Sequence, residues 1–414
     1  MISQPKLGRT LHEPHTVSRL GVSFCRRALA IALCFWALAC NSESLNNDPA
    51  IETPDDSGSE TPALDVVPGP FARAELVPLY DAPSGFSATA LAFDPARSGE
   101  LWVTLRQFPD SRPCTSIATE QTGCSTRIGQ IALVKQATSE SPATQLKRDG
   151  NGWHFLRRPT AIAFGDNGHL ATCGEARTDN YEDDPIDYSG PVLWSSDPAI
   201  FGVKPEPAQN GTHIDMLHET PYCMGIAHES ANVYFAFNGQ LGAVDRYDFK
   251  SPHVVGGEDH ADGELYRFLE GELLRTPEIP SHMMLEDAER KLYIADTGHG
   301  RVVRLNVDSG TPGEEVLAYD PIAVHLAMDG AVLEDVVAQG VLTSPSGILV
   351  SPRFLVVTDN ASSTIHWFDH AGASLGSLHT GLPTGSLSGI AAGPDGKLYL
   401  SDLQTGTAYR VEPR

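Results

Sequence analysis

The chain has 414 residues, of which 41% are hydrophobic, so it is long enough to bury a substantial core. Its formal net charge of −24 argues against binding to nucleic acid or to an anionic membrane surface, because both would repel it. We expect most of the acidic residues to lie on a solvated surface. The alternative is that acidic loops bind Ca²⁺.

Residues 1–39 have the features of a secretory signal peptide. Arg26 and Arg27 precede an apolar run, Ala28 to Ala39, that is too short to span a bilayer but suits the hydrophobic region of such a signal. The run ends in ALAC, which resembles the cleavage site of bacterial lipoproteins. That resemblance implies a lipid on Cys40 and, with Asn41 after it, retention in the outer membrane. Cleavage at a plain A-x-A site would instead give a secreted or periplasmic soluble protein.

Residues 40–70 are acidic, rich in Ser, Pro and Asp, and poor in apolar residues, so they are predicted to be a disordered tether. If Cys40 carries a lipid, four cysteines remain beyond the signal segment, an even number suited to two disulfides in an oxidising compartment. These four are Cys114, Cys124, Cys173 and Cys223.

From residue 71 onward one pattern recurs, a small apolar pair, a turn and an apolar strand that ends in a polar residue. The copies are TALAFDPARSGELWVTLR, TAIAFGDNGHLATCGE, MGIAHESANVYFAFN, HMMLEDAERKLYIAD, SGILVSPRFLVVTD and SGIAAGPDGKLYLSD. Each predicts two short β-strands joined by a tight turn, and several are followed by a third strand. Asp329–Val341 is the one segment where we expect a short helix instead, in an inserted loop.

Such repeats cannot bury both faces alone, so they are expected to close radially into a propeller. LYIADTGHGRVVRL, TDNASSTIHWFD and LYLSDLQTGTAYRV resemble NHL repeats, and the similarity covers roughly residues 85–414. The resemblance implies an all-β, six-bladed β-propeller of NHL type over residues 71–414. The strand-like segment Ala74–Tyr80 is expected to pair with the last blade and close the ring.

Aligning the copies defines two sets of equivalent positions. The first set begins each innermost strand and should surround the top of the central channel, where top means the face of the loops that precede these strands. It holds Thr89, Thr160, Met224, His282, Ser346 and Ser388. The second set ends each second strand, and its aspartates should accept backbone N–H bonds in the turn that follows. It holds Leu105, Gly174, Asn238, Asp296, Asp359 and Asp402. Cys173 and Cys223 fall at the top of adjacent blades and could pair, although four cysteines allow other connectivities.

His282 occupies the position at which a related group of NHL propellers, the peptidyl-α-hydroxyglycine α-amidating lyases, places three zinc-binding histidines. The other five equivalent positions here hold Thr, Met or Ser, so the ligand set of those lyases is incomplete. His213 and His218, in a segment that we place in the top loop entering blade 3, could complete a three-ligand zinc site with His282. Otherwise these loop histidines bind backbone or face solvent.

A second candidate cation site is expected on the opposite face, where loops of blade 3 carry His228, His253, Asp259 and His260. The segment GEDHADGE resembles an oxygen-rich cation loop but lacks the EF-hand spacing. The sequence therefore predicts zinc or calcium as the candidate cofactor. His299, in DTGHGR, is interpreted as a turn residue.

The sequence contains no nucleophile elbow, P-loop, haem motif or dinucleotide-binding motif. It therefore favours an extracytoplasmic, lipid-anchored binding or interaction module that takes a protein, peptide or small-molecule ligand on its top face. Contact with a membrane is expected through the lipid anchor only. The alternative is a metal-dependent lyase or hydrolase with a zinc-type site at the top of the central channel.

Overall fold

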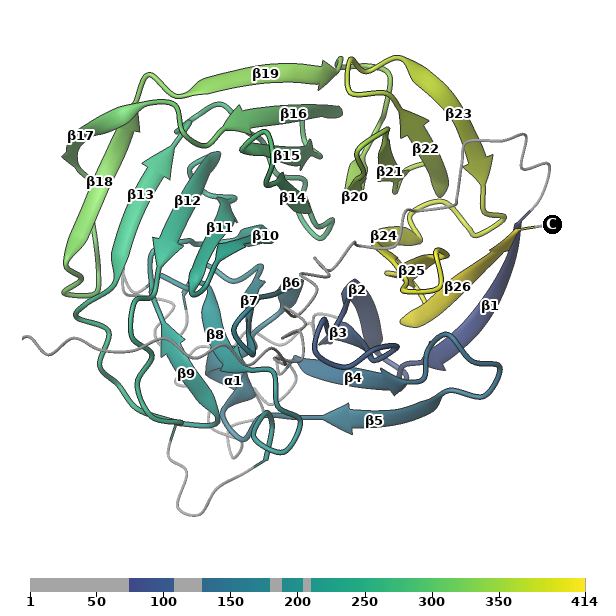
Figure 1. The fold of residues 1–414 in the computed structure, drawn as a ribbon, viewed down its shortest axis with the longest axis horizontal. Coiled ribbons are helices and arrows are strands. Elements are labelled where there is room, and N and C mark those ends of the chain that lie inside the picture. Colours follow the sequence, from purple (N-terminus) through teal and green to yellow (C-terminus); the bar gives the residue numbers. More distant parts are fainter. Residues whose placement is uncertain (1–73, 108–128, 179–187, 204–209, 414) are drawn as a thin grey trace, which may run out of the picture. The chain divides into compact units, whose positions relative to one another are not determined.

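The structure of the protein is a computed structural model that describes residues 74–107, 129–178, 188–203 and 210–413. The chain divides into two units, Met1–Ser57 and Gly58–Arg414, and every described residue belongs to the second. The strands of this unit form six sheets arranged around a common centre (Figure 1). In the described ranges the helix α1 (Gly152–Phe155) spans four residues, and no helix there is long and apolar enough to cross a membrane. The predicted all-β, six-bladed propeller is confirmed.

Blades 1 and 2 are four-stranded antiparallel sheets whose strands run outward from the centre in chain order. Blade 1 consists of β2 (Phe86–Phe93), β3 (Leu101–Gln107), β4 (Gln130–Lys135) and β5 (Ala143–Lys147). Blade 2 consists of β6 (Pro159–Phe164), β7 (His169–Gly174), β8 (Val192–Ser195) and β9 (His213–Met216).

Blades 3 and 4 are linked by an insertion that contributes strands to both. Blade 3 consists of β10 (Cys223–Ser230), β11 (Val233–Asn238), β12 (Ala243–Asp248), β13 (Glu264–Phe268), β18 (Val324–Asp329) and β17 (Thr311–Glu315). Blade 4 consists of β14 (Met283–Glu286), β15 (Lys291–Asp296), β16 (Arg301–Asn306) and β19 (Val332–Val337). β18 pairs in parallel with β13, and β19 then returns to the edge of β16 (Figure 1).

The helix predicted within Asp329–Val341 is wrong. The segment begins at the end of β18, turns at Gly330, whose φ is +74°, and continues as β19. Backbone groups at the edge of β16 need partners, and the pairing of β19 with β16 satisfies them, which a helix could not do.

Blades 5 and 6 complete the ring. Blade 5 consists of β20 (Pro345–Val350), β21 (Leu355–Asp359), β22 (Thr364–Phe368) and β23 (Ser374–His379). Blade 6 consists of β24 (Leu387–Ala392), β25 (Leu398–Asp402), β26 (Thr407–Pro413) and β1 (Ala74–Asp81). β1 pairs antiparallel with β26, so the predicted closure by the first strand is confirmed. It joins the two ends of the repeat array and covers the edge of β26.

The core lies between the blades. Six clusters of buried apolar side chains are present, and each combines residues of two neighbouring blades. The cluster between blades 1 and 2, for example, packs Trp102 against Phe201 and Phe164, with ring centroids 5.2 and 5.4 Å apart. Each fully buried aliphatic or aromatic side chain contributes about 1.5–3 kcal/mol.

Hydrogen bonds near the beginnings of the inner strands join every pair of neighbouring blades. Thr89, Thr160, Ser346 and Ser388 are fully buried and donate their hydroxyls to carbonyls of a neighbouring blade, whereas the carbonyl of Met224 accepts a backbone N–H. The bonds are Thr89 Oγ1 to Pro159 O (2.9 Å), Thr160 Oγ1 to Cys223 O (2.7 Å), Ser281 N to Met224 O (2.9 Å), Ser346 Oγ to Pro280 O (2.8 Å), Thr358 Oγ1 to Ser388 O (2.6 Å) and Ser388 Oγ to Thr89 O (2.7 Å). The predicted ring of inner-strand positions is confirmed.

The predicted backbone bond within the following turn is present at Asp402, whereas Asp296 and Asp359 accept backbone N–H groups from the segments that precede β14 and β20. Asp296 accepts the backbone N–H of Leu274, Asp359 that of Ser344, and Asp402 that of Gln404. His299 lies in the turn after β15, with its Nδ1 2.8 Å from Asp296 Oδ2, which confirms its interpretation as a turn residue.

We predict that Ser388→Ala destabilises the protein by about 1–2 kcal/mol, because the buried hydrogen bond that links blade 6 to blade 1 is lost. The measurement is the denaturant midpoint of unfolding. Ser377→Ala, at an exposed position on β23, is the matched control and should unfold like the wild type. Equal midpoints for the two variants would contradict this role of the inner ring.

Candidate functional site

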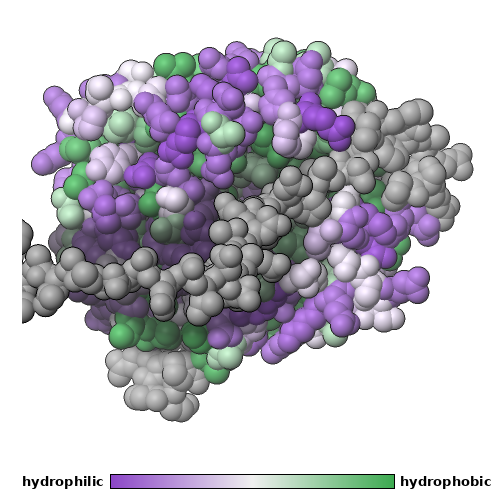
Figure 2. All heavy atoms as spheres, viewed as in Figure 1, coloured by the Kyte–Doolittle hydropathy of each residue, from purple (hydrophilic) through white to green (hydrophobic). Residues whose placement is uncertain are grey.

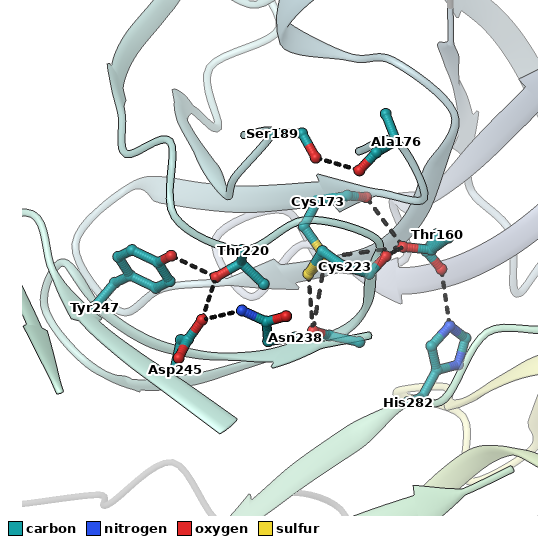
Figure 3. Close-up of a disulfide and its surroundings, with 11 residues drawn as sticks. Thr160, Cys173, Ala176, Ser189, Thr220, Cys223, Asn238, Asp245, Tyr247 and His282 are labelled. Carbon is teal, nitrogen blue, oxygen red and sulfur yellow. Dashed lines mark hydrogen bonds between the residues drawn. A yellow bond between two sulfur atoms is a disulfide. The ribbon is translucent and has the colours of Figure 1, made fainter. Parts of the chain in front are cut away.

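A disulfide joins blades 2 and 3 at the top face. Cys173 and Cys223 are bonded, with an S–S distance of 2.13 Å and a Cα–Cα distance of 5.7 Å (Figure 3). The predicted pairing of these two cysteines is confirmed, while Cys40, Cys114 and Cys124 lie outside the described residues. The bond fixes the end of β7 against the beginning of β10, and the segments that flank it form the wall of a pocket.

This top-face pocket has a volume of about 460 Å³ and is rich in arginine. Arg157 and Arg158 precede β6, Arg177 follows β7, and Arg275 comes from the connection between β13 and β14. With Glu175 and Glu278 as the acidic residues of its lining, the described part of the pocket has a formal net charge of +2. A cationic pocket in a chain of net charge −24 is the opposite of what composition predicts.

The carboxylate of Glu175 holds the arginines in place. It is nearly fully buried and lies 3.1 Å from Arg106 Nη1, 3.2 Å from Arg158 Nη2 and 2.6 Å from Arg275 Nη1. The backbone N–H of Glu278 donates to the same carboxylate. The carboxylate of Glu278 pairs with Arg106 and Arg158 as well, so two carboxylates face three guanidinium groups and the network keeps a net positive charge next to the pocket.

Further contacts orient the guanidinium planes. Arg275 stacks over the ring of Tyr222 at 4.1 Å, and Arg177 lies 5.4 Å from the ring centre of Tyr188. Arg158 donates through Nη2 to Glu278 Oε1, but its Nε–H is buried and has no hydrogen-bond partner among the described residues.

The electrostatic effect of this arrangement is visible at Glu278. Its side chain is 48% exposed. Burial alone would raise the pKa of its carboxyl, but the charges of Arg106 and Arg158 outweigh burial and hold it below its usual range. The pocket therefore favours a negative charge placed against its arginines.

Sequence reasoning did not identify this pocket. The one signal available was the position of Arg106, Arg157, Arg158 and Arg177, each next to an end of a strand that faces the top of the propeller.

His282 reaches across the centre of the propeller. It immediately precedes β14 in blade 4, yet its Nε2 lies 3.0 Å from the carbonyl oxygen of Thr160 in blade 2 (Figure 3). A Cβ on Gly389, in blade 6, would lie 3.3 Å from the Cε1 atom of the same ring. Because a carbonyl oxygen only accepts, Nε2 carries the proton of this bond. Burial lowers the pKa of His282 to about 4, so the ring is neutral at neutral pH.

The structure does not bring His213 and His218 into one group with His282. His213 lies on β9, the outermost strand of blade 2, so its predicted place in a top loop of blade 3 is wrong. The segment HIDM pairs with β8 and completes blade 2, an outer strand that the two-strand repeat does not reveal. His218 follows in the loop, with Nδ1 3.0 Å from Asp320 Oδ2. In the described part of the chain, no three ligand atoms within 4.8 Å of one another include those of His282.

Two of the four residues expected on the opposite face do come together, with a third that joins them. The ligand atoms of His253, His260 and Asp215 all lie within 4.8 Å of one another. His228 is not in this group, because its Nε2 lies 3.1 Å from Ala231 O in the turn after β10. Asp259 is exposed and accepts the backbone N–H of Ala261.

Comparison with known proteins supports the fold. No family model and no curated protein matches this sequence. An auxiliary nutrient binding protein from Bacteroides ovatus ATCC 8483 is 12% identical over 85% of this chain and 76% of that chain, with a TM-score of 0.50. The calcium-binding protein regucalcin from Agrobacterium tumefaciens str. C58 is 14% identical over 83% of this chain and 96% of that chain, with a TM-score of 0.47. At 12% identity the likeness to the nutrient binding protein shows a shared fold and nothing about ligands.

We predict that His282 makes the protein less stable in acid. Its pKa is about 4 in the folded protein and about 6.5 in the unfolded chain, so only the unfolded chain binds the proton between these values. The free energy of unfolding should therefore fall as the pH drops from 6.5, by roughly 3 kcal/mol at pH 4 from this residue alone.

The measurement compares denaturant unfolding of the wild type and His282→Gln between pH 7 and pH 4.5. The glutamine amide can still donate to the Thr160 carbonyl but does not titrate, so the variant should lose less stability in acid. His379→Gln, at an exposed position on β23, should follow the wild type. Parallel curves for wild type and His282→Gln would show that the ring is not held neutral.

Proposed function

We propose that this protein is an extracytoplasmic, lipid-anchored binding protein whose top-face pocket holds a small anionic molecule that bears carboxylate or phosphate groups. The observation that carries the proposal is the arginine-lined pocket organised by the buried carboxylate of Glu175. Its volume of about 460 Å³ lies within the range of small-molecule sites.

The charge distribution supports an anion as ligand. An acidic surface repels anions in general. The local cluster of guanidinium groups therefore directs an anion to the pocket. Guanidinium groups match the planar geometry of carboxylate and phosphate, and the buried Nε–H of Arg158 offers a donor without a partner among the described residues. Hydrophilic residues predominate on the face shown in Figure 2.

The alternative of a lyase or hydrolase with a metal over the central channel has weaker support. It lacks a group of ligands around His282 in the described part of the chain.

The proposed location rests on two observations. The disulfide between Cys173 and Cys223 is of a kind that persists in oxidising, extracytoplasmic compartments. The segment that ends in ALAC supports lipid attachment at Cys40 and an outer-membrane place for the mature chain, with the secreted or periplasmic soluble form as the alternative.

We predict that anions such as pyrophosphate and citrate bind to the full chain and that Arg275→Gln weakens their binding at least tenfold. The loss of one charge-assisted hydrogen bond costs about 1.5–3 kcal/mol, which corresponds to a factor of about 10–100 in affinity. Isothermal titration at low salt measures it, and binding should weaken as salt is added.

Arg353→Gln is the matched control, because Arg353 is exposed on blade 5 and does not line the pocket. The control should bind the anions like the wild type. If wild type, Arg275→Gln and Arg353→Gln bind them equally, or none of the three binds them, the proposed anion site is wrong.

We predict that Cys40→Ser abolishes lipid attachment, since the thiol is the acceptor of the lipid. The variant should move from the detergent phase to the aqueous phase on phase partitioning of cell extracts, while Cys25→Ser should partition like the wild type. A wild-type chain that already partitions into the aqueous phase would favour the soluble alternative.

A further inference from the structure

Five histidine rings follow one another in contact where the loop of residues 249–263 in blade 3 meets β9 of blade 2. The centroid distances are 5.7 Å for His154 and His218, 6.4 Å for His218 and His260, 5.4 Å for His260 and His253, and 4.9 Å for His253 and His213.

The loop of residues 249–263 is fixed against β9 by backbone hydrogen bonds. The N–H of His253 donates to the carbonyl of Ile214 at 3.0 Å, and the N–H of Gly256 to that of His213 at 2.8 Å. In addition, Asn210 Nδ2 donates to Glu258 Oε1 at 2.6 Å. These contacts hold His253 and His260 of the loop next to Asp215 of β9.

The hydrogen bonds of the rings determine which nitrogens are free to act as ligands. Nδ1 of His253 lies 2.7 Å from Val254 O, and Nδ1 of His213 lies 2.8 Å from Asn210 O. Since each carbonyl accepts, each Nδ1 carries the proton, and each Nε2 keeps its lone pair. The Nε2 of His253 is buried and has no hydrogen-bond partner among the described residues. An Nδ1–H bonded to a carbonyl, with Nε2 left over, is the usual arrangement of a metal-binding histidine.

We propose that His253, His260 and Asp215 bind a zinc-type divalent cation. The three side chains come from two elements, and their ligand atoms all lie within 4.8 Å of one another. Two imidazoles and one carboxylate form a nitrogen-rich set suited to zinc, whereas Ca²⁺ needs six to eight oxygen ligands.

Binding of the cation requires a small closure of the site. Ligand atoms bound to one zinc ion lie about 3.3 Å apart, given bond lengths near 2.0–2.1 Å. In the structure Nδ1 of His260 lies 2.9 Å from Asp215 Oδ1, which is a hydrogen-bond distance, so a metal bound through this nitrogen would replace the proton that now joins the two side chains. The loop that carries His253 would thereby be bound to blade 2 through the metal.

The cation would act as a clamp between blades 2 and 3 at their outer strands. The same two blades are already joined near the inner strands by Cys173 and Cys223. This role is independent of the top-face pocket, because none of the three ligands lines that pocket.

The test uses the full chain purified in detergent without chelator, with zinc as the probe. Elemental analysis should find about one zinc per wild-type chain and less than a tenth of that in His253→Ala and His260→Ala. His379→Ala is the matched control and should keep the metal. Removal of zinc from the wild type with a chelator should lower the midpoint of thermal unfolding by about 4 °C, and the two variants should not respond.

A second measurement separates ligand loss from misfolding. Cobalt(II) added to the metal-free wild type should give visible absorption bands, and His253→Gln, which preserves the size of the side chain, should lose them. Zinc bound equally by the wild type and both alanine variants, or no binding when zinc is added to the wild type, would overturn the proposal. Loss of zinc in His282→Ala alone would also overturn it, because the metal would then lie at the central channel.

Discussion

The closure of six sheets around one axis is the constraint on which the rest of the structure depends. Neighbouring inner strands come so close that a Cβ on Gly225 would lie 2.1 Å from Ser281 O, and one on Gly347 would lie 2.5 Å from Ser388 O. Buried hydroxyls fit into this narrow space and satisfy carbonyls of the next blade, which larger side chains could not do. His282 is the one large polar side chain of this ring, and it spans the centre instead of lining it.

The functional consequence lies at the top face, where the rigid ring fixes the loops that precede and follow its strands. Glu175 and Arg106 are placed there by β7 and β3, and Arg275 by the connection to β14. The buried carboxylate of Glu175 brings guanidinium groups together that would otherwise repel one another. Because these ion pairs fix the guanidinium groups, the donors are already oriented for the anion that we propose as ligand.

The sequence predicts those features that depend on one repeat or on neighbouring repeats. The six inner hairpins follow from aligning the copies, which also places Cys173 and Cys223 at the top of adjacent blades, and Ala74–Tyr80 is strand-like by its own sequence. Features that depend on insertions cannot be predicted from the repeat pattern. The strands β17, β18 and β19 lie between repeats, and their partners β13 and β16 cannot be identified from a pattern of alternating residues.

The repeat pattern does not predict the candidate sites either. The grouping of Asp215 with His253 and His260 depends on a loop of blade 3 that folds back onto an outer strand of blade 2, which no spacing in the sequence reveals. The arginine pocket likewise combines residues more than a hundred positions apart in the chain, such as Arg158 and Arg275. The sequence pointed to His282 because of its residue type, yet in the structure its side chain packs at the axis. The arginines, to which the sequence did not point, line the pocket.

The central claim is that the top-face pocket is the place where an anion binds. Anomalous diffraction from crystals grown with selenate, a tetrahedral dianion with a distinctive scatterer, tests it most directly. We expect a selenium peak in the pocket, with selenate oxygens within hydrogen-bonding distance of Arg158 and Arg275. Selenium peaks only at other surfaces, with these arginines uncontacted, would contradict it.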